Sequence, residues 1–293
     1  MAVSEYKQIA RQSRIKCLEL VFQAQTSHIG SLMSCADIMA VLFEKIDLDR
    51  DKFVLSAGWK ACMLYFHLWR KRRITEEELN SYCQRVICDR CRGTGKKLMG
   101  KTLCKKCNGS GKVWSKWIGL VEPVHPALVF GTGSMGGGLP AGTGFALAKK
   151  FKKEKGIIYV IESDGGMQVG QTWEAVQIAA HHKLNNLVLI VDDNSLQAMG
   201  PTKKILNIHP LDKKLKAFGW NVKKINGHNF RQIEKALRQA RGRPQKPFAI
   251  IAKTVKGFPI SFMSGNNVYH YKNLSKQEYV KALKELTTEY INC

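Results

Sequence analysis

The sequence lacks a long hydrophobic run. Its stretch with the fewest charges, residues 118–149, contains Glu122, three prolines and a glycine cluster, so no membrane-spanning helix is predicted. The N-terminus lacks the apolar core and cleavage site of a signal peptide and continues as a charged amphipathic helix. Internal repeats and low-complexity tracts are also absent. These absences predict a cytosolic protein.

Acidic residues are scarce. The 293 residues include 47 Lys+Arg and 23 Asp+Glu, a net charge of +24, and 44% are hydrophobic, which allows a sizeable core and excludes disorder and a collagen-like chain. Residues 85–116 hold ten basic residues and one acidic residue, which gives +9 and leaves +15 elsewhere. Most of the remainder is lysine on helix faces. We interpret it as a solvated surface in preference to a nucleic-acid groove.

Four of the nine cysteines form two pairs, Cys88 with Cys91 and Cys104 with Cys107, and each pair continues as Cys-x-Gly-x-Gly. Twelve residues between the pairs can form a hairpin, so the four thiolates can bind one tetrahedral Zn²⁺. Disulfides or a chance pattern are the alternatives. The other cysteines are interpreted as core or incidental residues: Cys17, Cys35, Cys62, Cys83 and Cys293.

The doubled cysteine module resembles half of the zinc finger of DnaJ-type cochaperones, whereas the rest of the chain does not resemble a cochaperone. We predict that residues 87–112 are an insertion that interrupts a helix over 76–85, with Thr75 as its N-cap. The flanking segments, 1–86 and 113–293, would form one domain. A structural clip or a subunit contact suits the module better than catalysis.

Apolar strands alternate with amphipathic helices outside this module. This alternation predicts an α/β fold with a doubly wound, mostly parallel sheet flanked by helices, which binds ligands beyond the carboxyl ends of its strands. The strands are expected at 53–55, 156–161, 187–191 and 248–252. The helices are expected at 4–25, 34–43, 59–71, 171–181, 229–241 and 275–288, with a further one following the glycine-rich turn 131–140 and ending at Lys150.

Polar residues follow two of these strands. Asp164 and two glycines come after the strand that ends at Ile161, and Asn194 comes after the strand that ends at Val191. Adjacent strands of a βαβ unit would bring the two side chains together. One carboxylate, one amide oxygen and one backbone carbonyl form a partial oxygen shell that suits Mg²⁺ and leaves positions for diphosphate and water.

The segment from Ser163 to Ala175, followed by residues 191–197, resembles the thiamine diphosphate motif of transketolases. Four other segments agree with that family: residues 27–40, 53–58, 134–139 and 251–270. The resemblance covers almost the whole chain except the cysteine module. It is strongest to the N-terminal half of transketolase, which some organisms encode as a separate subunit.

This resemblance implies a role for each matching residue. Asp164, Asn194 and the carbonyl of Leu196 would bind Mg²⁺, and the backbone of Gly165 would contact the diphosphate. Gly133, Ser134 and Met135 would pack against the cofactor rings. His270 would contact the diphosphate and the substrate, and His28 would face the substrate. Glu174 matches an acidic position near a dimer contact. The other histidines are interpreted as structural, apart from His125, a weaker substrate-site candidate.

The resemblance also implies a reaction. The family transfers a two-carbon ketol unit from a ketose to an aldose, as in the pentose phosphate pathway, with thiamine diphosphate as electron sink. The carboxylate that activates the aminopyrimidine ring lies in the family's second domain, which this chain does not contain. We therefore expect a transferase that works with a pyrimidine-binding partner chain, in a heterotetramer with two copies of each.

Several positions depart from the family pattern. Trp59 stands where the family has a histidine on the diphosphate side, Ser163 replaces the first glycine of the Gly-Asp-Gly turn, and Val169 replaces an acidic residue. The family's Gly-His-Pro-Glu segment has no clear counterpart. Two alternatives therefore stand beside a transketolase: another carboligase similar to deoxyxylulose-phosphate synthase, and a noncatalytic protein whose basic zinc module binds nucleic acid or a protein.

Overall fold

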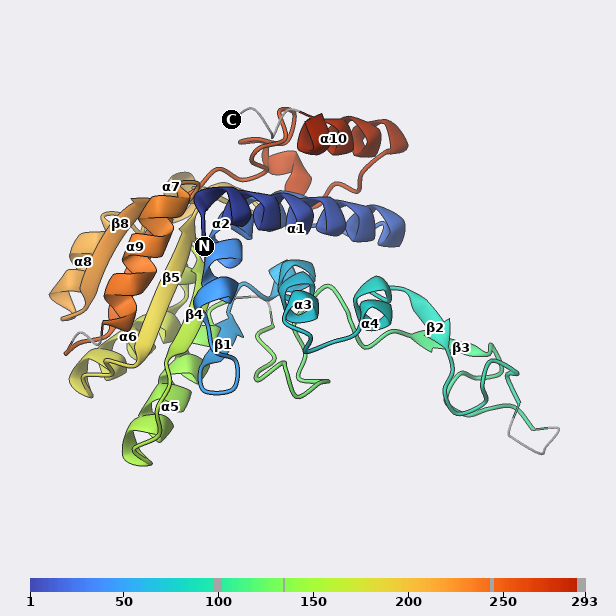
Figure 1. Cartoon of the computed structure of the whole chain (residues 1–293), viewed down its shortest axis with the longest axis horizontal. Helices are drawn as coiled ribbons and strands as arrows, with labels where there is room; N and C mark the ends of the chain where they lie inside the picture. Colours follow the sequence, from blue (N-terminus) through green and yellow to red (C-terminus); the bar gives the residue numbers. More distant parts are fainter. Residues whose placement is uncertain (97–101, 134, 243–244, 289–293) are drawn as a thin grey trace.

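The computed structural model describes residues 1–96, 102–133, 135–242 and 245–288. Its centre is a parallel five-stranded sheet, as the alternation of strands and helices predicts (Figure 1). In spatial order the strands are β1 (Lys52–Leu55), β4 (Ile158–Ser163), β5 (Leu187–Asp193), β9 (Phe248–Lys253) and β8 (Asn221–Asn226). The two central strands β4 and β5 are buried along their whole length.

Helices cover both faces of the sheet, because alternate residues of each strand point to opposite sides. One core packs the sheet against α1 (Val3–Ala24), α2 (Ile29–Lys45), α3 (Ala61–Arg70), α9 (Phe230–Arg241) and α10 (Lys276–Thr288). The other core packs it against α5 (Gly138–Phe151), α6 (Gly170–His181) and α8 (Leu211–Ala217). No helix within the described part of the chain is long and apolar enough to cross a membrane.

One expectation was wrong, and one strand was not predicted. The helix predicted over 76–85 ends early, since α4 covers only Glu76–Asn80; Cys83 then adopts a left-handed backbone, and its N–H donates to the carbonyl of Trp117. The strand that was not predicted is β8. It lies at the edge of the sheet and its lysines face solvent, so its sequence lacks the apolar run that marked the central strands.

The cysteine module lies at the end of an antiparallel hairpin formed by β2 (Arg85–Ile87) and β3 (Lys112–Trp114). Figure 1 shows that this hairpin carries the module away from the sheet and its helices. The predicted boundaries of the insertion, 87–112, therefore fall on the two strands of the hairpin. The module does not contribute to either core of the sheet.

Short elements connect the strand ends at the predicted ligand edge. Three 3₁₀ helices lie there: η1 (Gly58–Lys60), η2 (Gly166–Gln168) and η3 (Asn267–His270). A two-stranded ribbon of β6 (Leu196–Gln197) and β7 (Gly200–Pro201) leads into α7 (Thr202–Ile205). These connections position the side chains described next.

Candidate functional site

Asp164 and Asn194 lie at the same edge of the sheet. β4 and β5 pair in parallel with Ser163 opposite Asp192, and the N–H of Asp164 donates to the carbonyl of Asp192 at 3.3 Å. Asn194 directly follows β5. The expectation that two neighbouring strand ends bring these residues together is therefore confirmed.

The carboxylate of Asp164 is buried and only partly satisfied. Its Oδ2 accepts a hydrogen bond from Thr202 Oγ1 at 2.8 Å, and its Oδ1 accepts one from the N–H of Gly165 at 3.0 Å. Burial raises the pKa of Asp164 to about 7, and the nearby carboxylates of Asp193 and Asp192 contribute to the rise. A buried carboxylate beside two others is stabilised by a cation, so this donor set fits Mg²⁺.

Asn194 begins a tight turn. Its Oδ1 accepts a hydrogen bond from the N–H of Leu196 at 3.0 Å, which folds residues 194–196 back over the strand end. The buried Oε1 of Gln197 has no hydrogen-bond partner among the described residues. An unsatisfied buried acceptor at this edge is what a site for a bound group would contain.

A cavity of about 130 Å³ opens beside these strand ends. Six of the predicted site residues line it: His28, Met135, Gly165, Asn194, Leu196 and His270. Asp164 does not line the cavity. Gly133 adopts a left-handed backbone, and no atom beyond its chain neighbours lies within 4 Å of where a Cβ would stand. Ser134 lies outside the described residues.

The two predicted histidines face each other. The N–H of His28 donates to the carbonyl of His270 at 2.9 Å, and the ring centroids are 4.8 Å apart. Burial lowers the pKa of His28 to about 4 and that of His270 to about 3, and Lys256 adds to both shifts. Both imidazoles are therefore neutral at pH 7, so each can donate one proton and accept another.

Sequence reasoning missed two buried lysines. Lys256 Nζ lies 2.6 Å from Nδ1 of His270 and 3.0 Å from Oδ1 of Asn267. As an ammonium, Lys256 can only donate, so Nδ1 accepts and the proton of the neutral His270 ring is on Nε2. Burial lowers the pKa of Lys256 to about 8. Lys256 follows β9 at the same carboxyl edge, and the rule that found Asp164 and Asn194 would have found it too.

Lys60, the second of these lysines, forms a buried ion pair with Asp192, with Nζ 2.5 Å from Oδ2. Asp192 also accepts hydrogen bonds from the hydroxyls of Ser34 and Thr254. Trp59, which precedes Lys60, lines the cavity with its ring centroid 6.4 Å from that of His28. The position that departs from the family pattern therefore faces the same cavity as the predicted site residues.

The remaining histidines and Glu174 lie away from this cavity. His228 connects Oδ2 of Asp37, at 2.7 Å, to the N–H of Val255, which is a structural role as expected. His125 packs on Trp117 and borders a different hollow, so it does not line the cavity beside His28 and His270. Glu174 is exposed on α6.

The four cysteines of the module form one cluster. Their Sγ atoms all lie within 4.8 Å of one another, with 3.9 Å between Cys88 and Cys104 and 3.6 Å between Cys91 and Cys107. Tetrahedral zinc with Zn–S bonds of about 2.3 Å requires sulfur atoms about 3.8 Å apart. The four thiols are free, so the disulfide alternative is wrong.

Comparison with known proteins identifies similar chains. Residues 5–87 and 113–289 match the family described as "Transketolase, thiamine diphosphate binding domain", and residues 88–112 are left out of the match. The chain is 27% identical to one subunit of the apulose-4-phosphate transketolase of Phocaeicola vulgatus, over 98% of this chain and 95% of that protein. It is 33% identical to the subunit of the same name from Actinobacillus succinogenes, over 89% of this chain and 88% of that one.

A solved transketolase from Campylobacter jejuni has a similar fold, with a TM-score of 0.80 and 27% identity over 97% of this chain. The present chain spans only 43% of that protein. The likeness therefore concerns one part of a larger enzyme.

The buried ion pair at this site generates a prediction about stability. Lys60→Met leaves the buried Asp192 without its cation, so we expect a loss of about 3–5 kcal/mol in the free energy of unfolding. Urea unfolding of the cofactor-free protein measures it. Adding Asp192→Asn should recover part of the loss. Lys253→Met is the matched control: its Nζ lies 3.7 Å from Asp193 but the side chain is 58% exposed, so the cost should be below about 1 kcal/mol. Equal stability of Lys60→Met and wild type would contradict the prediction.

Proposed function

Because the chain belongs to the family of transketolase thiamine diphosphate-binding domains, we propose that it is the diphosphate-binding subunit of a two-chain transketolase. The observation that carries this proposal is the edge where Asp164 and Asn194 meet beside a cavity lined by His28 and His270. The enzyme transfers a two-carbon ketol unit between sugar phosphates. Bound thiamine diphosphate supplies the electron sink for cleavage of the carbon–carbon bond.

The strand-end residues would hold the diphosphate through Mg²⁺. The carboxylate of Asp164, the amide oxygen of Asn194 and the carbonyl of Leu196 are hard oxygen ligands, and Gly165 has no side chain to keep a phosphate from its backbone. Lys256 adds a positive charge at the same edge. The turn at Gly133 and Met135, with Ser134, would pack against the cofactor rings.

The two histidines would handle protons and hydroxyls of the substrate. Both are neutral at pH 7, and Lys256 fixes the Nε2–H form of His270. His28 is held at the N-terminus of α2 by its backbone bond to His270. A neutral imidazole in a fixed orientation can accept a proton from a sugar hydroxyl directly, because it does not first have to lose a proton of its own.

A second chain is part of the proposal. This chain aligns with almost the full length of the relatives that are named as transketolase subunits. In contrast, it spans only 43% of the solved transketolase. We infer that a separate chain supplies the pyrimidine-binding domain and the carboxylate that activates the cofactor. The relatives named for apulose-4-phosphate favour a phosphorylated ketose as the donor. Two copies of each chain and a role in pentose phosphate metabolism rest on the family resemblance alone, whereas a cytosolic location is proposed from the sequence pattern.

The cysteine module would hold one structural Zn²⁺. Four buried thiols at tetrahedral spacing support this, and the hairpin places the metal away from the cavity. Each knuckle relies on glycine: a Cβ on Gly95 would come within 2.2 Å of the carbonyl oxygen of Gly109, and one on Gly111 within 2.2 Å of that of Gly93. The module would stabilise its own loops and would not take part in ketol transfer.

Cofactor binding should depend on Asp164. Asp164→Asn removes the charged Mg²⁺ ligand, so we expect Mg²⁺-dependent binding of thiamine diphosphate to weaken roughly 100-fold or more by calorimetry. Asp212→Asn is the matched control: this carboxylate lies on α8 near Lys224 and does not line the cavity, so its binding should stay within about threefold of wild type. Equal heats for Asp164→Asn and wild type would remove the basis of the proposal.

Ketol transfer should require the partner. The purified chain with thiamine diphosphate and Mg²⁺ should show no transfer from a ketose phosphate to an aldose phosphate, because the proposed partner supplies the other half of the active site. Adding the chain that carries the pyrimidine-binding domain should restore turnover, and Asp164→Asn should abolish it again. Full turnover by the single chain would refute the two-chain proposal.

The module should carry one zinc ion per chain. Metal analysis of the purified protein should find it, and Cys91→Ser should lose it because three thiolates bind Zn²⁺ less tightly than four. Cys83→Ser is the control, since this partly buried cysteine lies outside the cluster. Thiamine diphosphate affinity should be unchanged in both variants. Zinc that is absent from wild type, or retained in Cys91→Ser, would contradict the assignment.

A further inference from the structure

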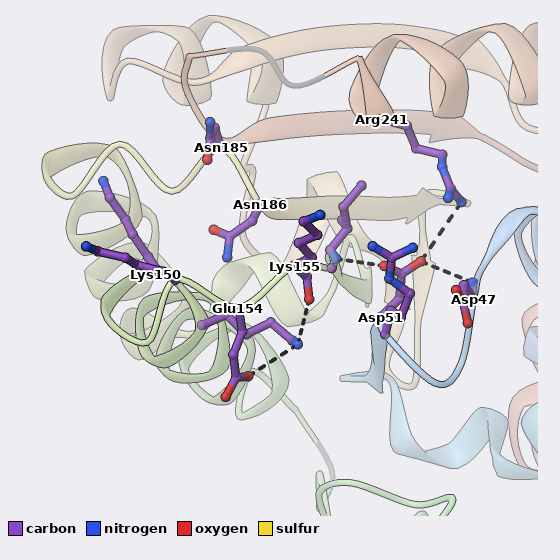
Figure 2. Close-up of a pocket in the computed structure, with 13 residues that line it drawn as sticks. Asp47, Asp51, Lys150, Glu154, Lys155, Asn185, Asn186 and Arg241 are labelled. Carbon is purple, nitrogen blue, oxygen red and sulfur yellow. Dashed lines mark hydrogen bonds and ion pairs between the residues drawn. The ribbon is translucent and has the colours of Figure 1, made fainter.

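A second hollow lies at the opposite end of the sheet. It has a volume of about 420 Å³ and is lined by the loop before β1, the end of α5 and the loop that follows it, the turn before β5, and Arg241 at the end of α9 (Figure 2). These segments precede β1, β4 and β5, whereas the candidate cofactor site follows them. Six strand residues at 3.3 Å each separate the two places by roughly 20 Å.

The hollow is strongly basic. Six cations line it, Arg50, Lys149, Lys150, Lys153, Lys155 and Arg241, against three carboxylates, Asp47, Asp51 and Glu154, which leaves a net charge of +3. Several of these groups are engaged with one another. Lys149 Nζ donates to the carbonyl of Lys155 at 3.0 Å and lies 3.6 Å from Glu154, and Asp51 accepts from the N–H of Ile157 at 2.8 Å, as the dashed lines in Figure 2 indicate.

Three of these cations have no side-chain partner in the described part of the chain. Among the residues that the structure describes, no hydrogen bond or ion pair engages the side chains of Arg50, Lys153 and Lys155. The side-chain amide of Asn185 is also unengaged within that part of the chain. Like charges gathered around one hollow repel each other, so an anion that bridged them would be favoured.

The loop that carries these cations is held in place. Gly156 adopts φ +120°, and a Cβ there would come within 2.0 Å of the carbonyl oxygen of Arg50, so the two loops are in close contact. The bond from Lys149 to the carbonyl of Lys155 fixes the other side. The cationic groups therefore start from a preorganised backbone, which lowers the entropy cost of binding.

We propose that this hollow, which we call the basic hollow, binds a small molecule that carries a chain of two or three phosphates. A single phosphate would leave part of the +3 charge unmatched, and 420 Å³ has room for a triphosphate with an attached group. The amide of Asn185 offers a donor and an acceptor to that group. This site is distinct from the cofactor site and does not depend on the proposed function.

Calorimetry with inorganic tripolyphosphate and the full chain, without added divalent cation, tests the proposal. Wild type should bind one tripolyphosphate with an affinity that falls as salt rises. The triple variant Arg50→Gln, Lys153→Gln, Lys155→Gln should bind at least about tenfold more weakly. The matched control Lys213→Gln, Lys216→Gln, Lys235→Gln loses the same charge from exposed helix positions and should stay within about threefold of wild type.

Lys256→Met, which removes the cation at the cofactor edge, should bind tripolyphosphate as wild type does, which separates this site from the cofactor site. Titration with ATP distinguishes two sources of the same chemistry: tighter binding than tripolyphosphate assigns a nucleotide, and equal binding assigns the phosphate chain alone. Three results would overturn the proposal. They are an absence of saturable binding to wild type, equal weakening in the two triple variants, and loss of binding in Lys256→Met.

Discussion

The carboxylate of Asp192 connects the elements that form the candidate cofactor edge. It lies at the end of β5, pairs with Lys60 from η1, and accepts hydrogen bonds from Ser34 on α2 and Thr254 after β9. Burial opposes its ionisation, but Lys60 and these hydrogen bonds outweigh burial and lower the pKa of Asp192. Because a buried ion pair is costly to break from one side, Asp192 constrains three separate chain segments to one geometry.

A second buried carboxylate, that of Glu162, positions the glycine turn that follows β4 at the same edge. Glu162 accepts from the hydroxyl of Ser56 and from the N–H of Ser163 at 2.9 Å, and the Ser56 hydroxyl in turn accepts from the N–H of Gly138 at 3.0 Å. A Cβ on Gly166 would come within 1.9 Å of Glu162 Oε1. Burial raises the pKa of Glu162 to about 7. Position 166 therefore requires glycine because a larger residue would collide with the Glu162 side chain, whether or not a phosphate is bound.

Local pattern and strand-end logic were enough to predict the central strands and the meeting of Asp164 with Asn194, because buried parallel strands leave a continuous apolar record in the sequence. The edge strand β8 has no continuous apolar run in its sequence, so it was not predicted. The ion pair between Lys60 and Asp192 was missed for a different reason. The two residues lie 132 positions apart in the sequence, and a lysine in a chain with many lysines gives no sign that it is buried. The helix predicted over 76–85 was wrong because a long-range bond, from Cys83 to Trp117, replaces its last turns.

The surface around the cavity bears on why this chain would need a partner. Met135 and Tyr271 line the cavity and are 37% and 63% exposed, and beside it Met199 and Val268 are 83% and 58% exposed. Met199 and Val268 lie next to the bond between Asn267 and the carbonyl of Ala198, so these apolar groups are held at the cofactor edge. The cysteine module and the basic hollow lie elsewhere and leave this edge clear. Apolar side chains held in water around a site are stabilised when a second surface covers them, and a pyrimidine-binding partner would both cover them and complete the chemistry.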